Sequence, residues 1–203
     1  MFDTAVQWSK DSWGLLPLMA CVFIIGLSIV IERAVYLSKT IKNGLSLEYD
    51  LLRVKRGDTV DGEKVAKHYA NTFQGDLVKT ALENKGQSSE ELERKLDESI
   101  MFQLPKLDRN LWMLDTAVTL GPLLGLLGTI IGMIESFNVL GAAGVSNPTG
   151  VTGGIAHALI ATAVGLSIAI VCVVPLNYFT KRIRLVVNQL DLIKAMLIDR
   201  YAA

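Results

Sequence analysis

Three long stretches of this sequence carry almost no charge, and their length limits the possible folds more than any other feature. No charged residue occurs at positions 13–31 or 116–134, and His157 is the only side chain in 136–180 that titrates near neutral pH. A bilayer core about 30 Å thick needs roughly 20 apolar residues in helical form, because lipid offers no hydrogen-bond partner to an exposed backbone amide. The sequence therefore predicts an all-α integral membrane protein with three transmembrane helices.

The positions of the charged residues divide the chain and predict its orientation. We expect transmembrane helices at 13–31, 112–140 and 151–180, a periplasmic N-terminus at 1–12, a cytoplasmic helical region at 32–111, a periplasmic loop at 141–150 and a cytoplasmic amphipathic helix at 181–203. Basic residues beside a span stay in the cytoplasm, and here they follow the first and third spans as Arg33, Lys39, Lys42, Lys181, Arg182 and Arg184. The pattern predicts a multi-pass protein of the bacterial inner membrane, with the N-terminus in the periplasm and the C-terminus in the cytoplasm.

The region predicted to lie in the cytoplasm lacks the alternation typical of strands and favours helices. Glycines, which often end helices, separate its segments. The sequence predicts short helices at 45–56, 63–68 and 76–84, with breaks at Gly57, Gly62, Gly75 and Gly86.

A helix start is predicted just before the second span. Ser88 and Glu91 have the spacing of a capping box, in which a hydroxyl and a carboxylate each bond a free backbone amide. We expect one long helix to run from there into the second span, with kinks at Pro105 and Pro122 because proline removes a backbone hydrogen bond.

The C-terminal segment is predicted to be an amphipathic helix. Its apolar residues recur at helical spacing; they are Ile183, Val186, Val187, Leu190, Ile193 and Leu197. Two interpretations stay open: this stripe packs on the chain's own cytoplasmic helices, or it contacts another subunit.

The sequence contains no pattern that predicts an enzyme. It has no glycine-rich phosphate loop, nucleophile elbow or histidine cluster. His68 stands near Asp61 and Glu63. A single histidine on a charged, solvated segment argues against a metal site. We therefore expect no metal, no cofactor, no catalytic residue and no nucleic-acid partner, and we assign no chemical role to Cys21 or Cys172.

Small residues form narrow faces on the second and third spans. Gly121, Gly125, Gly128 and Gly132 recur every three or four residues and so lie along one helix stripe, which predicts close helix contact. Thr129 and Thr162 add a hydroxyl near the middle of each face. The candidates for pore lining or helix packing are Gly125, Gly132, Ser136, Ala158, Gly165 and Pro122.

Thr129, Thr162 and His157 are the candidates for an ion pathway, and each also has a structural interpretation. Membrane threonines often bond to carbonyls of their own helix. An ionisable residue inside a membrane suggests a functional site, although a neutral histidine can simply donate a hydrogen bond between helices. Five residues separate His157 from Thr162, which places them on different helix faces.

The carboxylates near the spans are expected at the membrane interfaces. Glu135 and Asp115 bound the second span, and Glu32 ends the first. If ions cross the membrane here, the essential carboxylate is expected to come from another protein.

Three stretches resemble the MotA/TolQ/ExbB proton channel family, specifically its ExbB/TolQ branch. They are IERAVYL at 31–37, LGPLLGLLGTIIGMIESF at 120–137 and GGIAHALIATAVGL at 153–166. The resemblance implies a homopentamer around a central pore, which encloses the single transmembrane helices of a dimeric ExbD- or TolR-like partner. It also implies that an aspartate of the partner carries the ion past Thr129 and Thr162. ExbB proteins often have glutamate where this chain has His157, so the role of that position is not transferred unchanged.

The function predicted on this basis is a channel subunit of an inner-membrane motor. It would couple the proton motive force to work on a TonB- or Tol-type cell-envelope system through the ExbD- or TolR-like partner. A TonB- or TolA-like protein and membrane lipid are the other expected partners. A flagellar or gliding stator is one alternative, although such chains usually have four spans. A non-conducting membrane scaffold is the other, and the sequence leaves open whether the ion is a proton or sodium.

Overall fold

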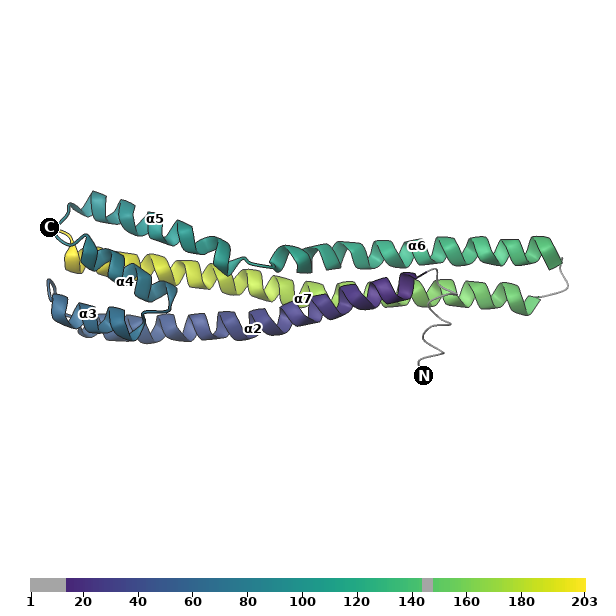
Figure 1. Ribbon diagram of the computed structural model, residues 1–203, viewed down its shortest axis with the longest axis horizontal. Helices are drawn as coiled ribbons and strands as arrows, with labels where there is room; N and C mark the ends of the chain where they lie inside the picture. The colour runs from purple at the N-terminus through teal and green to yellow at the C-terminus, as the bar shows by residue number, and fades with distance from the viewer. Residues whose placement is uncertain (1–13, 144–147) are drawn as a thin grey trace. The chain divides into compact units, whose positions relative to one another are not determined.

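The computed structural model describes residues 14–143 and 148–203, and no strand occurs within them (Figure 1). The helices are α2 (Leu15–Arg53), α3 (Thr59–His68), α4 (Phe73–Glu83), α5 (Ser89–Leu107), α6 (Leu111–Ala143) and α7 (Pro148–Tyr201). Three stretches of these residues are long and apolar enough to cross a bilayer, at Leu15–Arg53, Ser89–Gly141 and Val151–Tyr201. The prediction of an all-α protein with three candidate membrane-spanning helices is confirmed.

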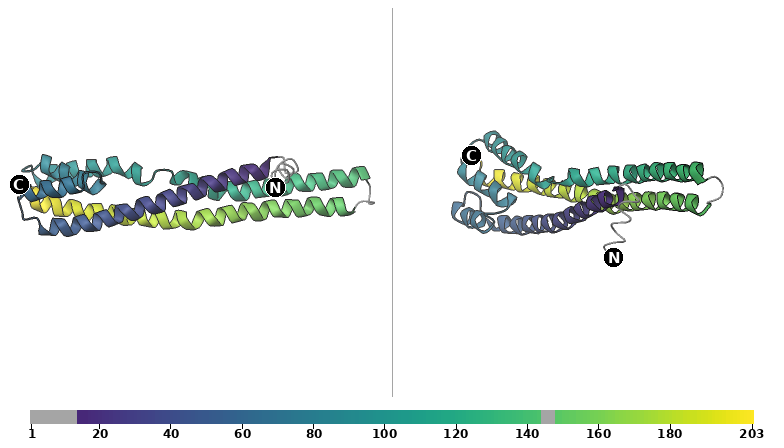
Figure 2. Two further views of the ribbon diagram at one scale, coloured as in Figure 1. Left: turned by 60° about the horizontal axis from the view of Figure 1, so that its bottom comes forward. Right: turned by 45° about the vertical axis from the view of Figure 1, so that its right-hand side comes forward.

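Contacts divide the chain into two units. The membrane unit comprises the described residues up to Ile31 together with Asn110–Asn177, and the charged unit comprises Glu32–Arg109 and Tyr178–Ala203. In the membrane unit, α6 and α7 run side by side, with the first part of α2 against them (Figures 1 and 2). In the charged unit, α3, α4 and α5 accompany the second part of α2 and the last part of α7.

Two helices continue through boundaries that the sequence predicted. The segment 45–56 is no separate helix, because α2 continues through it to Arg53. Likewise α7 is a single helix of 54 residues that includes both the third predicted span and the amphipathic segment. A change from apolar to charged side chains alters the surroundings of a helix but breaks no backbone hydrogen bond. The predicted loop at 141–150 is shorter as well, because α6 reaches Ala143 and α7 begins at Pro148. Positions 1–13 and 144–147 lie outside the described residues.

Only two of the four glycines proposed as breaks stand in turns. Gly57 and Gly86 adopt φ values of +78° and +81°, which glycine tolerates without a steric penalty. Gly62 and Gly75 lie buried inside α3 and α4, so the prediction of breaks there was wrong. A Cβ atom at Gly75 would collide with the backbone of Tyr69, which shows that close packing requires the glycine.

The predicted helix start at Ser88 is present, but the long helix after it is interrupted. The Ser88 hydroxyl accepts a hydrogen bond from the Glu91 amide at 3.3 Å, and α5 then ends at Leu107, two residues after Pro105. Asn110 has φ +65°, a left-handed conformation that asparagine tolerates and that does not continue a helix. The prediction of one continuous helix was therefore wrong, whereas α6 does continue through Pro122.

The apolar stripe of the C-terminal segment packs within its own unit. Val186, Leu190, Ile193 and Leu197 are each at most 1% exposed, which supports the first of the two interpretations of this stripe. Beside it, the Lys194 ammonium donates to the Asp97 carboxylate of α5 at 2.8 Å. The hydrogen bond to Asp97 raises the pKa of Lys194.

A buried arginine completes the end of α5 in the charged unit. Arg33 is 2% exposed, and its guanidinium donates to the carbonyl oxygens of Lys106 and Leu107 at 3.3 and 3.5 Å. It also donates to the Glu32 carboxylate at 2.9 Å and lies 5.0 Å from the ring centroid of Tyr36. The last carbonyls of a helix lack partners within it, and a cation there is favourable. Arg33 therefore fixes the C-terminus of α5 against α2.

Replacement of Arg33 by glutamine is expected to destabilise the charged unit by about 2 kcal/mol, because a buried, charge-assisted donor to two carbonyls is lost. Thermal unfolding of the full chain in lipid nanodiscs, followed by circular dichroism, measures the change. The matched control is Arg94→Gln, which alters an exposed arginine on the same α5 helix. Equal melting temperatures for the two variants would contradict the role assigned to Arg33.

Candidate functional site

The glycine stripe of α6 lies directly against α7. A Cβ atom at Gly121 would stand 2.7 Å from the carbonyl oxygen of Gly165, and one at Gly125 would stand 3.0 Å from the Cα atom of Thr162. At Gly132 it would lie 2.9 Å from the Cβ atom of Ala158. Cβ atoms rarely approach other atoms this closely, so the two backbones meet at a distance that disfavours larger residues. We call this contact the α6–α7 seam.

The α7 side of the seam is equally small. Ala158 and Ala161 are 3% and 7% exposed, and a Cβ atom at Gly165 would collide with the carbonyl oxygen of Gly121. Ser136 closes one end of the seam, where its hydroxyl hydrogen-bonds the carbonyl oxygens of Gly132 at 2.8 Å and Val151 at 3.3 Å. Because lipid tails are as apolar as leucine, this close backbone packing is what holds such helices together.

The two threonines bond in different ways. Thr129 donates to the carbonyl oxygen of Leu126 in its own helix at 2.7 Å, as the structural interpretation predicted. Thr162 instead donates across the seam to the carbonyl oxygen of Gly125 at 3.0 Å, so that interpretation is wrong for this residue. Because Gly125 has no side chain, α7 lies close enough for the Thr162 hydroxyl to reach the Gly125 carbonyl oxygen. Both threonine side chains stay partly exposed.

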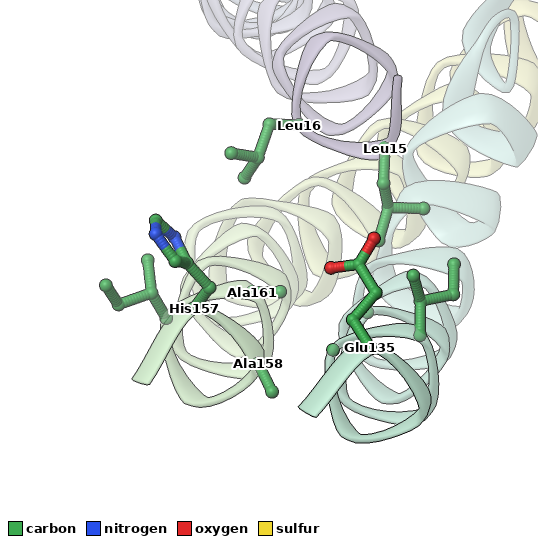
Figure 3. A pocket seen from close by; sticks show the side chains of 10 residues that line it. Leu15, Leu16, Glu135, His157, Ala158 and Ala161 are labelled. Atoms are coloured by element: carbon green, nitrogen blue, oxygen red, sulfur yellow. The ribbon is translucent and has the colours of Figure 1, made fainter. Parts of the chain in front are cut away.

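A pocket lies on the other flank of the seam, where α2 covers α6 and α7 (Figure 3). The volume of the pocket is about 40 Å³. Leu15 of α2 packs on Gly128 of α6, where its Cδ2 atom lies 2.9 Å from the position that a Cβ atom of the glycine would take. The polar side chains of the pocket are Glu135 of α6 and His157 of α7. In Figure 3 both project from their helices towards the side on which α2 carries Leu15 and Leu16.

The structure thus separates the predicted ion-pathway residues into two groups. Thr129 and Thr162 both lie near Gly125, within about one helical turn of each other across the seam. His157 stands about 140° away from Thr162 around α7 and lines the pocket instead. The pocket lining includes Gly132 and Ala158, whereas Pro122, like Thr129, lies on the opposite flank of α6 by helical phase.

Glu135 is a pocket residue that the sequence did not single out as a candidate. It was expected at a membrane interface, and in the structure it lines the same pocket as His157. Its spacing contained a signal: Gly128, Gly132 and Glu135 stand at i, i+4 and i+7, which puts them on one helix face. What the spacing does not contain is the identity of the helix that covers that face.

The described part of the chain was also considered for metal or redox chemistry. Within residues 14–143 and 148–203, no three histidine, cysteine, aspartate or glutamate side chains are close enough to hold a metal ion. Cys172 is buried against Gly26 of α2, with its sulfur 3.0 Å from where a glycine Cβ would stand, and therefore acts as a small packing residue.

Comparison with known proteins identifies the family. The profile of the MotA/TolQ/ExbB proton channel family matches residues 69–192, which include the seam, both threonines and the pocket residues of α6 and α7. A Synechocystis protein named as biopolymer transport protein ExbB-like 3 is 33% identical over 158 residues, which cover 77% of this chain and 75% of that protein.

Two further relatives are named ExbB and TolQ, the two proteins that give the ExbB/TolQ branch its name. The biopolymer transport protein ExbB of Xanthomonas campestris is 33% identical over 114 residues, which cover 56% of this chain and 45% of that protein. The Tol-Pal system protein TolQ of Pseudomonas aeruginosa is 35% identical over 96 residues, which cover 47% of this chain and 42% of that protein. Together with the three apolar helices, these matches show that the chain is a multi-pass membrane protein of the MotA/TolQ/ExbB proton channel family and belongs to its ExbB/TolQ branch.

Proposed function

We propose that this chain is the channel subunit of a motor in the bacterial inner membrane. Five copies surround a central pore that holds the transmembrane helices of a dimeric, ExbD- or TolR-like single-span partner. Proton flow through the pore moves the partner, which passes force to a TonB- or TolA-like protein of the envelope. The N-terminus lies in the periplasm and the C-terminus in the cytoplasm.

The observation that carries this proposal is the flank of the seam with Thr129 and Thr162. It places two partly exposed hydroxyls close together on a surface otherwise formed by small and apolar side chains. No aspartate, glutamate, lysine or arginine occurs at positions 116–134 or 151–180. A confined path of this kind can solvate a proton carrier weakly, but it cannot bind the proton itself. The carrier must therefore be a carboxylate supplied by the partner.

The exposed surface of α6 supports assembly within a membrane. Leu123, Leu126, Ile130 and Phe137 are 50–64% exposed and lie on the face of α6 opposite to Glu135, the one charged residue of that stretch. A surface of this size and apolarity is stable against lipid or against another copy of the chain, but not against water. In the proposed homopentamer, neighbouring copies cover part of it and lipid covers the rest.

Co-reconstitution in liposomes tests the proposal. The full chain is incorporated with a single-span ExbD- or TolR-like protein, a potassium diffusion potential is applied, and an internal pH-sensitive dye reports proton entry. Flux is expected only when both proteins are present, because neither alone combines a pore wall with a carboxylate. The matched control replaces the membrane aspartate of the partner by asparagine and should abolish the flux.

Two outcomes contradict the proposal. If an assembled complex conducts no faster than empty liposomes, the chain is a membrane scaffold. If the purified assembly has no central cavity, the threonine flank faces lipid and lines no path. A stator that turns a rotor is not favoured, because only three stretches among the described residues can cross a bilayer.

A further inference from the structure

A second, larger cavity lies within the charged unit, between α2, α4 and α5. Its volume is about 470 Å³, which is within the range of roughly 300–1,000 Å³ that small-molecule sites occupy. Thr40, Gln74 and Gln103 are at most 8% exposed, and all three line this cavity. Buried polar side chains are costly unless they are hydrogen-bonded, so their concentration around one cavity indicates a built site.

Hydrogen bonds hold the polar wall of the cavity in place. The Gln74 side-chain amide donates to the carbonyl oxygen of Thr40 at 3.1 Å. The Lys106 ammonium donates to Oε1 of Gln103 at 2.8 Å, and Nε2 of Gln103 donates to the Asp76 carboxylate at 2.8 Å. This chain of bonds joins a cation of α5 to a carboxylate of α4, and both line the cavity.

The inner part of this wall offers hydrogen-bond acceptors. An ionised carboxylate such as that of Asp76 can only accept. The Thr40 hydroxyl already donates to the carbonyl oxygen of Tyr36 at 3.0 Å, so it has only lone pairs left. Oε1 of Gln74 is a buried acceptor without a donor among the described residues. A ligand that fits this wall must therefore carry donors, such as hydroxyl groups.

The outer part of the lining carries positive charge. Lys39 and Lys106 are both exposed and line the cavity, whereas Asp76 supplies its one carboxylate. Ammonium groups form strong, charge-assisted hydrogen bonds with phosphate oxygens. Asn43 and Asn71 add side-chain amides that can donate to the same oxygens. An anion is therefore favoured at the lysines, and hydroxyl groups are favoured at the aspartate.

We propose that this cavity binds a hydroxylated phosphate ester of the glycerol phosphate type. Lys39 and Lys106 hold the phosphate, and a ligand hydroxyl donates to the Asp76 carboxylate. The site goes beyond the channel function and does not depend on ion flow. The lining begins at Tyr36, shortly after the charge-free stretch ends at Ile31, so a lipid headgroup and a soluble molecule can both supply this chemistry.

Calorimetric titration of the full chain in phosphatidylcholine nanodiscs tests the site, with sn-glycerol 3-phosphate as the probe. Saturable binding is expected, about tenfold tighter than that of inorganic phosphate, because the hydroxyls add hydrogen bonds. Lys39→Gln should weaken binding about tenfold through the loss of a charge-assisted contact. Lys85→Gln is the matched control, since this exposed lysine lies outside the lining. No saturable binding, or an equal effect of the two substitutions, overturns the proposal.

Asp76→Asn tests the acceptor wall separately from the lysines. Asparagine still offers Gln103 an acceptor oxygen, but it replaces the other carboxylate oxygen by a donor. The preference for glycerol phosphate over inorganic phosphate should fall from about tenfold to near unity, while inorganic phosphate binds at least as tightly as before. Glu83→Gln, at the end of the same helix and outside the lining, should keep the preference. An undiminished preference in Asp76→Asn would refute a hydroxylated ligand.

A change of lipid distinguishes the two sources of the ligand. Phosphatidylglycerol and phosphatidylserine give nanodiscs of similar surface charge, but only the first has a glycerol headgroup. If the headgroup occupies the cavity, phosphatidylglycerol should weaken binding of the probe more than phosphatidylserine does. If the ligand is soluble, the two lipids should have the same effect. Neither titration requires proton flux, so the site can stand if the channel proposal fails, and the channel can conduct if the cavity binds nothing.

Discussion

Valine in place of Thr162 is expected to lower the proton flux of the reconstituted complex about tenfold and to leave the oligomer assembled. Valine has nearly the shape of threonine but lacks the hydroxyl, so the close packing at the seam is retained. A hydroxyl that solvates a proton carrier in a dry path contributes about 1.4 kcal/mol, and the loss of that interaction raises the barrier by the same amount. The dye assay described above measures the rate, and native mass spectrometry measures the assembly.

Two substitutions show whether the loss belongs to this hydroxyl. Thr162→Ser keeps the oxygen and should retain most of the flux. Ser167→Ala removes a hydroxyl from the same helix, at an exposed residue whose side chain donates to Ala163 in its own helix at 2.7 Å, and should change little. If Thr162→Val conducts as fast as the native chain, Thr162 does not line the path.

Leucine in place of Gly165 is expected to separate α6 from α7 and to destabilise the membrane unit by about 3 kcal/mol. A Cβ atom at this position already collides with the carbonyl oxygen of Gly121, and backbone cannot move aside as a flexible side chain can. The hydrogen bond from Thr162 to Gly125 lies one turn away on the same seam and should break when the helices part. Thermal unfolding in nanodiscs and the yield of assembled oligomer measure the effect.

Gly153 provides the matched control for this substitution. It lies in the same helix, but no atom stands within 4 Å of where its Cβ would be. Gly153→Leu therefore adds the same side chain and the same helix propensity without a collision, and it should unfold at nearly the native temperature. Similar losses of stability in the two variants would show that the seam does not depend on close backbone contact.

Local patterns in the sequence were enough to predict the helical class, three candidate spans and the contact face of α6. Charge-free stretches indicated three candidate spans because lipid excludes charged groups, and the spacing of Gly121, Gly125, Gly128 and Gly132 indicated a contact face. The hydroxyl of Ser88 marked the start of α5 correctly. Each of these inferences depends on residues a few positions apart.

The errors concern features that depend on residues far apart in the chain. Gly62 resembles a break in isolation, but it lies inside α3, where Tyr201, far along the chain, packs against it. Thr162 bonds across the seam because a glycine stands opposite to it on α6. The pocket that Glu135 and His157 line depends on α2, whose Leu15 and Leu16 cover that flank of the seam.

The hydrogen bonds of Thr129 and Thr162 also determine whether their hydroxyl oxygens can donate or only accept a further hydrogen bond. A backbone carbonyl cannot donate, so the hydroxyl protons of Thr129 and Thr162 must point at Leu126 and Gly125, and only lone pairs remain free. An ionised carboxylate, which can only accept, would meet two acceptors and be repelled. A protonated carboxylic acid could donate to either of them. A pore with this lining would therefore let the aspartate of a partner pass in its neutral form and hold back its anion.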